Sequence, residues 1–193
     1  MTTELFENYA IVNDIVSVKE IESLGYNENT DVAAVVICCD KEFQIDEADK
    51  NYLKNARFLT FIYSPDFSSF SAEFLMHFDM RLSGNEYFIN SDIFKEININ
   101  RYRLLCGEKD TYNLISYFTE KNASVYKSKL VRNVGSIDDV KKYCEILFKD
   151  KTHSEINCLV KCLTTARTGD IQSVFGQESV NFYEMIRQKV QGS

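Results

Sequence analysis

Carboxylates are the side chains of this sequence that best suit proton-transfer chemistry, and the stretch from Leu59 to Ile93 carries the two of greatest interest. Glu73 falls in the first turns of a predicted helix, where the helix dipole stabilises a negative charge without any catalytic role. The same residue lies among phenylalanines, and an apolar setting raises the pKa of a carboxyl group and so suits a general base at neutral pH. Asp92 fits an ordinary turn or strand end. The residues alone therefore leave a structural and a catalytic interpretation open for both carboxylates.

The cysteines, histidines and serines show no spacing typical of a metal site or a catalytic nucleophile. The six cysteines include no Cys-x-x-Cys pair, and His77 and His153 lack the spacing of metal ligands. We therefore predict no metal site, and buried, reduced thiols that pack as small apolar residues. Ser69 and Ser71 have no accompanying histidine–acid pair, which argues against a nucleophilic serine.

A strand, a turn and a helix are predicted to position Glu73. Residues 59–63 are rich in β-branched and aromatic types, which indicates a short buried strand. Ser64-Pro65-Asp66 ends it with the only proline of the chain. Apolar residues at spacings of three and four then predict a helix, with Ser68 or Ser69 as its cap. The apolar residues are Phe70, Phe74, Leu75 and Phe78.

The rest of the chain shows a similar alternation of predicted elements. The clearest buried strand is 31–37, and 129–134 is a second extended stretch. Residues 9–18 are predicted to form a hairpin that turns at Asn13-Asp14, with a helical turn after it at 19–24. Further helices are expected at 46–57, at 110–118 and from the Gly135-Ser136 cap to about Phe148.

The residues around the two carboxylates resemble those of the crotonase family, also called the enoyl-CoA hydratase/isomerase family. That family carries a Glu just inside a helix, an Asp six residues later and then an apolar–Arg pair. Glu73, Asp79 and Met80-Arg81 match this signature. A Phe and a second carboxylate follow in the family, and Phe88 and Asp92 occur at that spacing with one residue deleted.

The resemblance extends from about Asp31 to Arg187 as an ordered series of elements. Two strands and two helices carry it, at 31–37, 129–134, 156–167 and 171–186. It identifies a shortened and divergent member of the family. The implied fold class is α/β, an abbreviated crotonase-like ββα spiral with C-terminal helices, shortened in its N-terminal half.

The resemblance also implies a chemistry, enolate stabilisation on an acyl thioester carried by CoA or by a carrier protein. It assigns Glu73 and Asp92 as the catalytic acid and base. Two backbone N–H groups would form an oxyanion hole, one from Phe70 and the other from Gln44 or Ile45. Hydration or dehydration and double-bond isomerisation remain open, in a specialised biosynthetic pathway. No cofactor is implied.

Departures from the family pattern favour an alternative function. Phe70 lies where the family has a glycine-rich run, and its side chain would add bulk where the acyl group approaches. Asp92 replaces a Glu and lacks the preceding proline. The alternative is a catalytically degenerate crotonase that serves as a non-enzymatic partner subunit or an acyl-thioester binding module. A chance match in an unrelated α/β domain is a third possibility. Lys161 and Arg167 could meet a phosphate of the thioester arm, or could be solvated helix charges.

Composition limits the class of protein. The chain has 193 residues, of which 45% are apolar, and we expect a single domain over 1–193. A net charge of −7 disfavours nucleic acid and anionic membranes as partners. The sequence shows neither a membrane-spanning apolar run nor a secretory signal, so a cytoplasmic protein is expected. The resemblance implies a homo-oligomer, with a trimer first, because the family commonly assembles through its C-terminal helices. Apolar residues near the C-terminus are consistent with such an interface: Phe175, Phe182, Met185 and Ile186.

Overall fold

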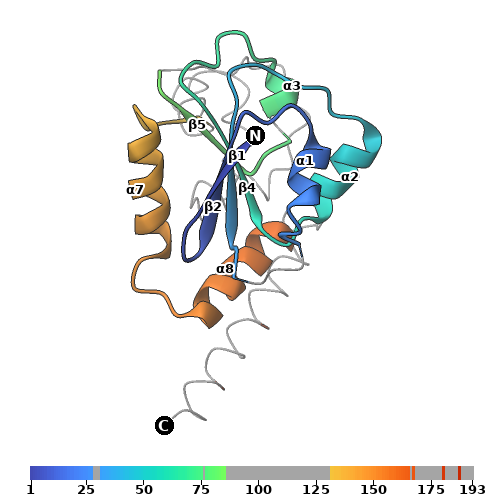
Figure 1. Ribbon diagram of the computed structural model, residues 1–193. Helices are drawn as coiled ribbons and strands as arrows, with labels where there is room; N and C mark the ends of the chain where they lie inside the picture. The colour runs from blue at the N-terminus through green and yellow to red at the C-terminus, as the bar shows by residue number, and fades with distance from the viewer. Residues whose placement is uncertain are drawn as a thin grey trace, which may run out of the picture.

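The computed structural model describes residues 1–27, 31–75, 77–85 and 131–165, together with Arg167, Val180 and Arg187. Its strands form a six-stranded sheet in sequential order. Figure 1 shows helices on both sides of this sheet. β1 runs antiparallel to β2, and the other neighbouring pairs are parallel. The strands are β1 (Thr2–Leu5), β2 (Tyr9–Asn13), β3 (Ala34–Cys38), β4 (Leu59–Ser64), β5 (Met80–Ser83) and β6 (Val131–Asn133).

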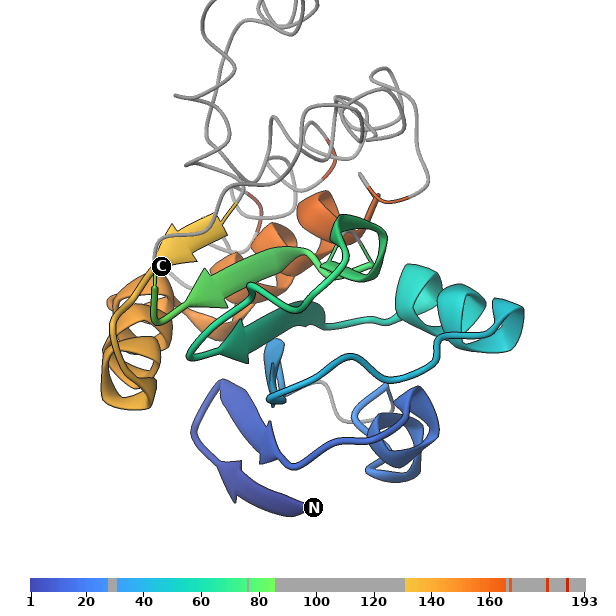
Figure 2. The same cartoon turned by 90° about the horizontal axis from the view of Figure 1, so that it is seen from above.

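The described helices divide between the two faces of the sheet according to their place in the chain. α1 (Val18–Ser23), α2 (Glu47–Asn55) and α3 (Ala72–Leu75) connect successive parallel strands and pack on one face. α7 (Ile137–Phe148) and α8 (His153–Thr165) pack on the other face (Figure 2). Each connecting helix therefore leads to the next neighbouring strand, and all three connecting helices lie on the same face. This arrangement is that of a spiral, and differs from a doubly wound sheet, in which the connecting helices lie on both faces. The predicted α/β class is confirmed.

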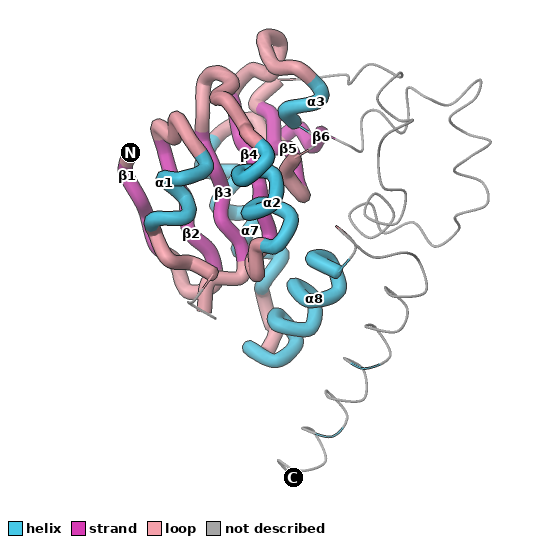
Figure 3. Tube along the Cα trace, turned by 90° about the vertical axis from the view of Figure 1, so that its right-hand side faces the viewer, coloured by secondary structure: helices cyan, strands magenta, loops and turns pink. Residues whose placement is uncertain are grey.

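Each face of the sheet has its own apolar core. The core under α1, α2 and α3 includes Phe58, Phe67 and Phe78, all fully buried, and the core under α7 and α8 includes Phe61 and Leu82. Full burial of one such side chain contributes roughly 1.5–3 kcal/mol. Figure 3 shows α1 and α2 in front of the strands of the sheet. β3 and β4 lie between the two cores, which explains why buried residues follow one another along both strands rather than alternate with exposed ones. The two strands predicted as buried are confirmed.

The predicted hairpin over residues 9–18 is wrong. β2 pairs with β1 on one side and with β3 on the other, and four of its five residues are buried. Asp14 adopts a left-handed backbone (φ 58°) that turns the chain out of the sheet, and α1 follows, as expected for 19–24. An apolar strand buried on both faces needs partners at both edges, which a local hairpin does not provide.

Helix caps account for two correctly predicted boundaries. Asp46 accepts a hydrogen bond from the Asp49 N–H at 2.8 Å, and Asp49 accepts one from the Asp46 N–H at 3.1 Å, which is a capping box at the start of α2. Ser136 caps α7 through the Asp139 N–H. The predicted helix at 110–118 lies outside the described residues, as does the predicted helix at 171–186 except for Val180.

Gly84 allows the end of β5 to lie against the turn that follows β4. A Cβ at this position would lie 2.7 Å from the Pro65 carbonyl oxygen and 3.1 Å from the Gly135 carbonyl oxygen. The Gly84 N–H donates to the Ser64 carbonyl at 3.0 Å. A larger residue at this position would therefore push the end of β5 away from the turn after β4. Within the described residues, we find no helix long and apolar enough to cross a membrane.

Candidate functional site

Two loops at the carboxyl ends of β3 and β4 carry the predicted backbone donors. Residues 39–46 connect β3 to α2, and residues 65–71 connect β4 to α3. Because the two strands are parallel neighbours, with Cys38 opposite Tyr63, both loops leave the same edge of the sheet. The Cys39 N–H joins them further by donating to the Tyr63 carbonyl at 3.1 Å. The sheet thus brings Gln44, Ile45 and Phe70 to one edge, although they are distant in sequence.

Ring contacts hold the first loop against α3. The Phe43 ring lies edge-on to Phe74 at a centroid distance of 5.0 Å and to Phe78 at 6.5 Å. Phe74 also contacts Phe70 at 5.7 Å, and Phe70 contacts Phe67 at 5.0 Å. Edge-to-face rings at these distances are favourable beyond their burial. The aromatic cluster (Phe43, Phe67, Phe70, Phe74 and Phe78) therefore fixes the position of both loops.

Phe70 differs from its predicted role in one respect. Its side chain is 4% exposed and packs into the aromatic cluster, so it does not add bulk on the approach to the site. Its backbone N–H, the predicted oxyanion donor, donates to the Phe67 carbonyl at 2.9 Å within the turn. Use of this N–H by a ligand would require the turn to release it.

The other N–H groups near the site differ in whether they donate a hydrogen bond. The Gln44 and Ile45 N–H groups donate no hydrogen bond to any part of the chain that the structure describes. The Ser71 N–H, next to Phe70, donates to the carboxylate of Glu42. Within the described residues, the Gln44 and Ile45 N–H groups therefore lack an acceptor, whereas the Phe70 and Ser71 N–H groups each have one.

The predicted proton-transfer residues are described only in part. Glu73 is the second residue of α3, which begins directly after the second loop, so its backbone lies at the expected edge of the sheet. Its side chain lies outside what the structure describes, as does the whole of Asp92. Their catalytic roles stay predictions.

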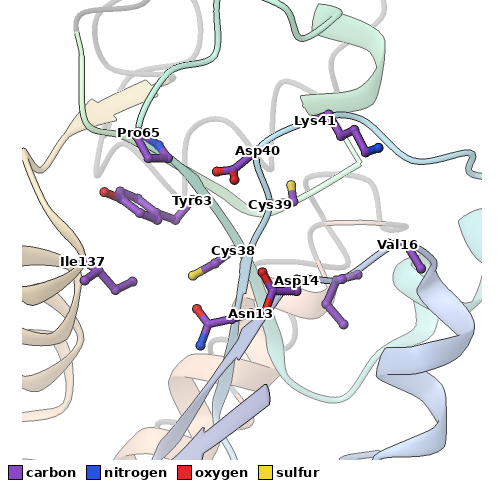
Figure 4. A pocket seen from close by; sticks show the side chains of 11 residues that line it. Asn13, Asp14, Val16, Cys38, Cys39, Asp40, Lys41, Tyr63, Pro65 and Ile137 are labelled. Atoms are coloured by element: carbon purple, nitrogen blue, oxygen red, sulfur yellow. The ribbon is translucent and has the colours of Figure 1, made fainter. Parts of the chain in front are cut away.

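A cleft of about 420 Å³ opens beside the two loops, at the carboxyl ends of β2, β3 and β4 (Figure 4). Its apolar walls include Val16, Pro65 and Ile137, and its polar lining includes Asp14 and Asp40. This volume falls in the range of small-molecule sites. Among the described residues, we find no cluster of side chains able to hold a metal ion.

The cleft also contains two thiols, which are poor nucleophiles. Burial raises the pKa of both Cys38 and Cys39 from 9.0 to about 12; the neighbouring Cys39 adds to the effect at Cys38, and the charge of Asp40 adds to it at Cys39. Burial likewise raises the pKa of Cys144 to about 12. All three are free thiols, together with Cys158. The prediction of reduced thiols that act as small apolar residues holds for these four.

The raised thiol pKa values predict a loss of stability in alkali. Between pH 9 and 12 the unfolded state releases thiol protons that the folded state retains, so unfolding becomes more favourable as the pH rises. For the fully buried Cys144, the contribution reaches about 1.4 kcal/mol per pH unit. Urea unfolding at pH 8 and pH 10.5 measures this loss, and Cys144→Ala should reduce it. An equal loss in Cys144→Ala would contradict the assignment to this thiol.

A buried ion pair joins the end of α8 to the residue before β5. The Arg167 guanidinium donates to both carboxylate oxygens of Asp79, with Nε–Oδ1 at 2.9 Å. Both side chains are 1% exposed. Three main-chain carbonyls accept its remaining hydrogens at 2.6–3.1 Å, those of Leu53, Ala56 and Phe58. Thr60 donates to Asp79 Oδ2 through its N–H at 2.7 Å and its hydroxyl at 2.9 Å. The pair is therefore fully hydrogen-bonded.

This geometry corrects the interpretation of Arg167. The hypothesis that it meets a phosphate is wrong, because its donors are used inside the protein, and it is not a solvated charge. Lys161 is exposed and lines a different cleft with Asn27 and Arg57, near the first residues of β3. That cleft lies at the opposite end of the strands from the two loops. The sequence signalled Asp79 through the family signature but gave no signal for its partner.

Comparison with known proteins supports the fold. No protein-family model matches the chain, and no curated protein does. Among solved structures, the chain is similar to an enoyl-CoA hydratase subunit I from Geobacillus kaustophilus HTA426, with a TM-score of 0.58 and 11% sequence identity. The match covers 99% of this chain and 91% of that chain. The chain therefore has a crotonase-type fold, as the sequence predicted.

Proposed function

We propose that this protein binds an acyl thioester and stabilises its enolate at the edge formed by the two loops. The observation that carries the proposal is the placement of Gln44, Ile45 and Phe70 at the carboxyl ends of adjacent parallel strands in a crotonase-type fold. Backbone N–H groups aimed at a developing oxyanion supply the main electrostatic stabilisation in such a site. We assign the neighbouring cleft of about 420 Å³ to the neutral pantetheine part of the thioester arm.

In the proposed reaction, the thioester carbonyl oxygen accepts hydrogen bonds from the Gln44 or Ile45 N–H and from the Phe70 N–H. Negative charge grows on that oxygen as a proton leaves the α-carbon. Glu73 takes or gives this proton, and Asp92 handles the proton of water at the β-carbon. Hydration, dehydration or double-bond isomerisation follows, according to whether water takes part.

Exchange of the α-proton tests the proposal most directly. The wild-type protein is incubated in D₂O with an enoyl thioester and a 3-hydroxyacyl thioester, each attached to CoA and to pantetheine. We expect deuterium at the α-carbon and interconversion of the two compounds. Protein that neither binds these thioesters nor exchanges their α-protons would reject the catalytic proposal.

A second candidate function has its own supporting observation. The Phe70 N–H is committed to the Phe67 carbonyl, and the Ser71 N–H to Glu42. A protein that has lost its oxyanion hole would retain the fold as a partner subunit or as a thioester-binding module. Binding of a thioester without α-proton exchange would favour the binding module.

We also propose a homo-oligomer, with a trimer first. The proposal rests on the apolar C-terminal sequence that includes Phe175 and Phe182, which lie outside the described residues. Multi-angle light scattering at micromolar concentration is expected to give about three times the 22.4 kDa mass of the chain. A mass near 22.4 kDa would contradict it.

A further inference from the structure

A second cleft, here called the α8 cleft, opens at the opposite end of the strands from the two loops. It lies beside the first residues of β3 and β4, against α8, and has a volume of about 410 Å³. The length of β3 separates it from the candidate oxyanion edge by roughly 15 Å. Its apolar lining is buried and consists of Val32, Ala33 and Val160. Its polar lining consists of Asn27, Arg57, Asn157, Lys161 and Thr164.

The polar lining carries two cations from different parts of the chain. One face of α8 presents Asn157, Lys161 and Thr164, which are spaced by three or four residues. Arg57 comes from the segment between α2 and β4. No carboxylate of the described residues lines the α8 cleft, and the exposed Asp31, near it in sequence, lies outside the lining. The cleft therefore collects positive charge in a protein whose net charge is −7.

The Arg57 guanidinium differs from those of other arginines in how its donors are used. Arg81 donates to the Phe78 carbonyl at 2.7 Å, and Arg167 donates to Asp79. The Arg57 side chain is exposed and forms neither a hydrogen bond nor an ion pair with any residue that the structure describes. Its planar group of N–H donors is therefore available to a ligand in the cleft.

The main chain around Arg57 is nevertheless held firmly. The Arg57 N–H donates to Asn27 Oδ1 at 2.9 Å. The carbonyls on either side, those of Ala56 and Phe58, each accept a hydrogen bond from Arg167 at 2.6 Å. Because Arg167 directly follows α8, these contacts also fix the α8 wall relative to the Arg57 wall. A cleft whose walls are fixed beforehand loses little conformational freedom when a ligand enters.

We propose that the α8 cleft binds a small organic anion, a carboxylate or a phosphate ester that carries an apolar body. The Arg57 guanidinium holds two oxygens of the anion, a geometry that suits carboxylates and phosphates alike. Lys161 adds a second positive charge, and the buried apolar lining contacts the body of the ligand. The inference does not rest on the proposed thioester function, because the two sites lie at opposite ends of the strands.

Titration of the full chain followed by ¹H–¹⁵N NMR tests the site with four probes: phenyl phosphate, benzoate, benzyl alcohol and inorganic phosphate. With at least one of the two ring-bearing anions, we expect saturable shifts at the N–H groups of Ala33, Arg57 and Lys161, and a Kd of about 1 mM or below. The tighter of these two anions identifies the preferred class. Benzyl alcohol lacks the charge and inorganic phosphate lacks the ring, so each should bind at least about tenfold more weakly.

Substitutions of Arg57 assign the binding to its guanidinium. Arg57→Met retains the apolar stem and should weaken binding of the tighter anion at least about tenfold. Arg57→Lys retains the charge without the planar donors and should fall between wild type and Arg57→Met. The control is Lys54→Met, which makes the same change in net charge at an exposed residue of α2 outside the lining. Its affinity should stay within about twofold of the wild type.

Four results would overturn the inference. They are the absence of saturable shifts at the cleft with both ring-bearing anions, wild-type affinity in Arg57→Met, equal affinity for benzyl alcohol, and a loss in Lys54→Met equal to that in Arg57→Met. Inorganic phosphate that binds as tightly as phenyl phosphate would indicate an adventitious ion only and would also overturn it. None of these results bears on the thioester function, because the N–H groups of Gln44 and Ile45 report on that edge separately.

Discussion

Replacing Arg167 with methionine is expected to lower the free energy of unfolding by about 3–5 kcal/mol. The substitution leaves the Asp79 carboxylate buried without its counter-charge, and leaves three main-chain carbonyls without their donor. Removal of one partner of a buried pair costs far more than the pair itself contributes, because the remaining charge cannot return to water. Urea unfolding followed by circular dichroism measures the loss.

Two further variants define the cause of this effect. Lys142→Met removes an exposed ion pair with Asp139 at 3.0 Å and should leave the unfolding midpoint almost unchanged. The double variant Asp79→Leu/Arg167→Met removes both charges and should recover part of the stability lost in Arg167→Met. A single variant as stable as the wild type would show that the pair is not buried in solution.

Replacing Glu73 with glutamine is expected to reduce turnover of an enoyl or 3-hydroxyacyl thioester by at least about 100-fold. The amide retains the volume of the side chain but cannot accept the proton. The thermal midpoint should change little, since the helix and its neighbours are preserved. Initial rates with each thioester, together with thermal unfolding, measure both quantities.

The control for Glu73 is a glutamate in an equivalent place on another helix. Glu47 is the first residue of α2, so Glu47→Gln removes a favourable charge from a helix start without touching the site. Its turnover should equal that of the wild type. Asp92→Asn should impair hydration more than α-proton exchange, because Asp92 is the proposed partner of water. Full turnover by Glu73→Gln would show that the match of this helix to the family signature is wrong.

The proposed catalysis requires a change in the turn that contains Phe70. Catalysis needs N–H groups that point at the ligand, whereas the Phe70 N–H is held by the Phe67 carbonyl. An enolate-like ligand binds strongly only if the free energy gained from its hydrogen bonds exceeds the free energy needed to open this turn. Tighter binding of acetoacetyl-pantetheine than of a simple acyl-pantetheine would show that the edge opens for an enolate, as transition-state complementarity requires.

Local sequence determined the elements on which the site is built. Continuous apolar runs identified β3 and β4 because both strands are covered on both faces. Polar caps fixed the starts of α2 and α7, since Asp46 and Ser136 satisfy N–H groups only a few residues away. The ordered series of family-like segments then predicted the crotonase-type fold that the structural comparison supports.

Tertiary structure decided the interactions between distant residues. Arg167 and Asp79 are 88 positions apart, and a helix pattern does not distinguish a solvated arginine from one that is buried beside a carboxylate. Glu42 and Ser71 are 29 positions apart and meet only because β3 and β4 are neighbours in the sheet. The burial of Phe70 and the inclusion of β2 in the sheet likewise depend on partners from other segments. Each of these depends on which surfaces other segments cover, and local propensity carries no information about that.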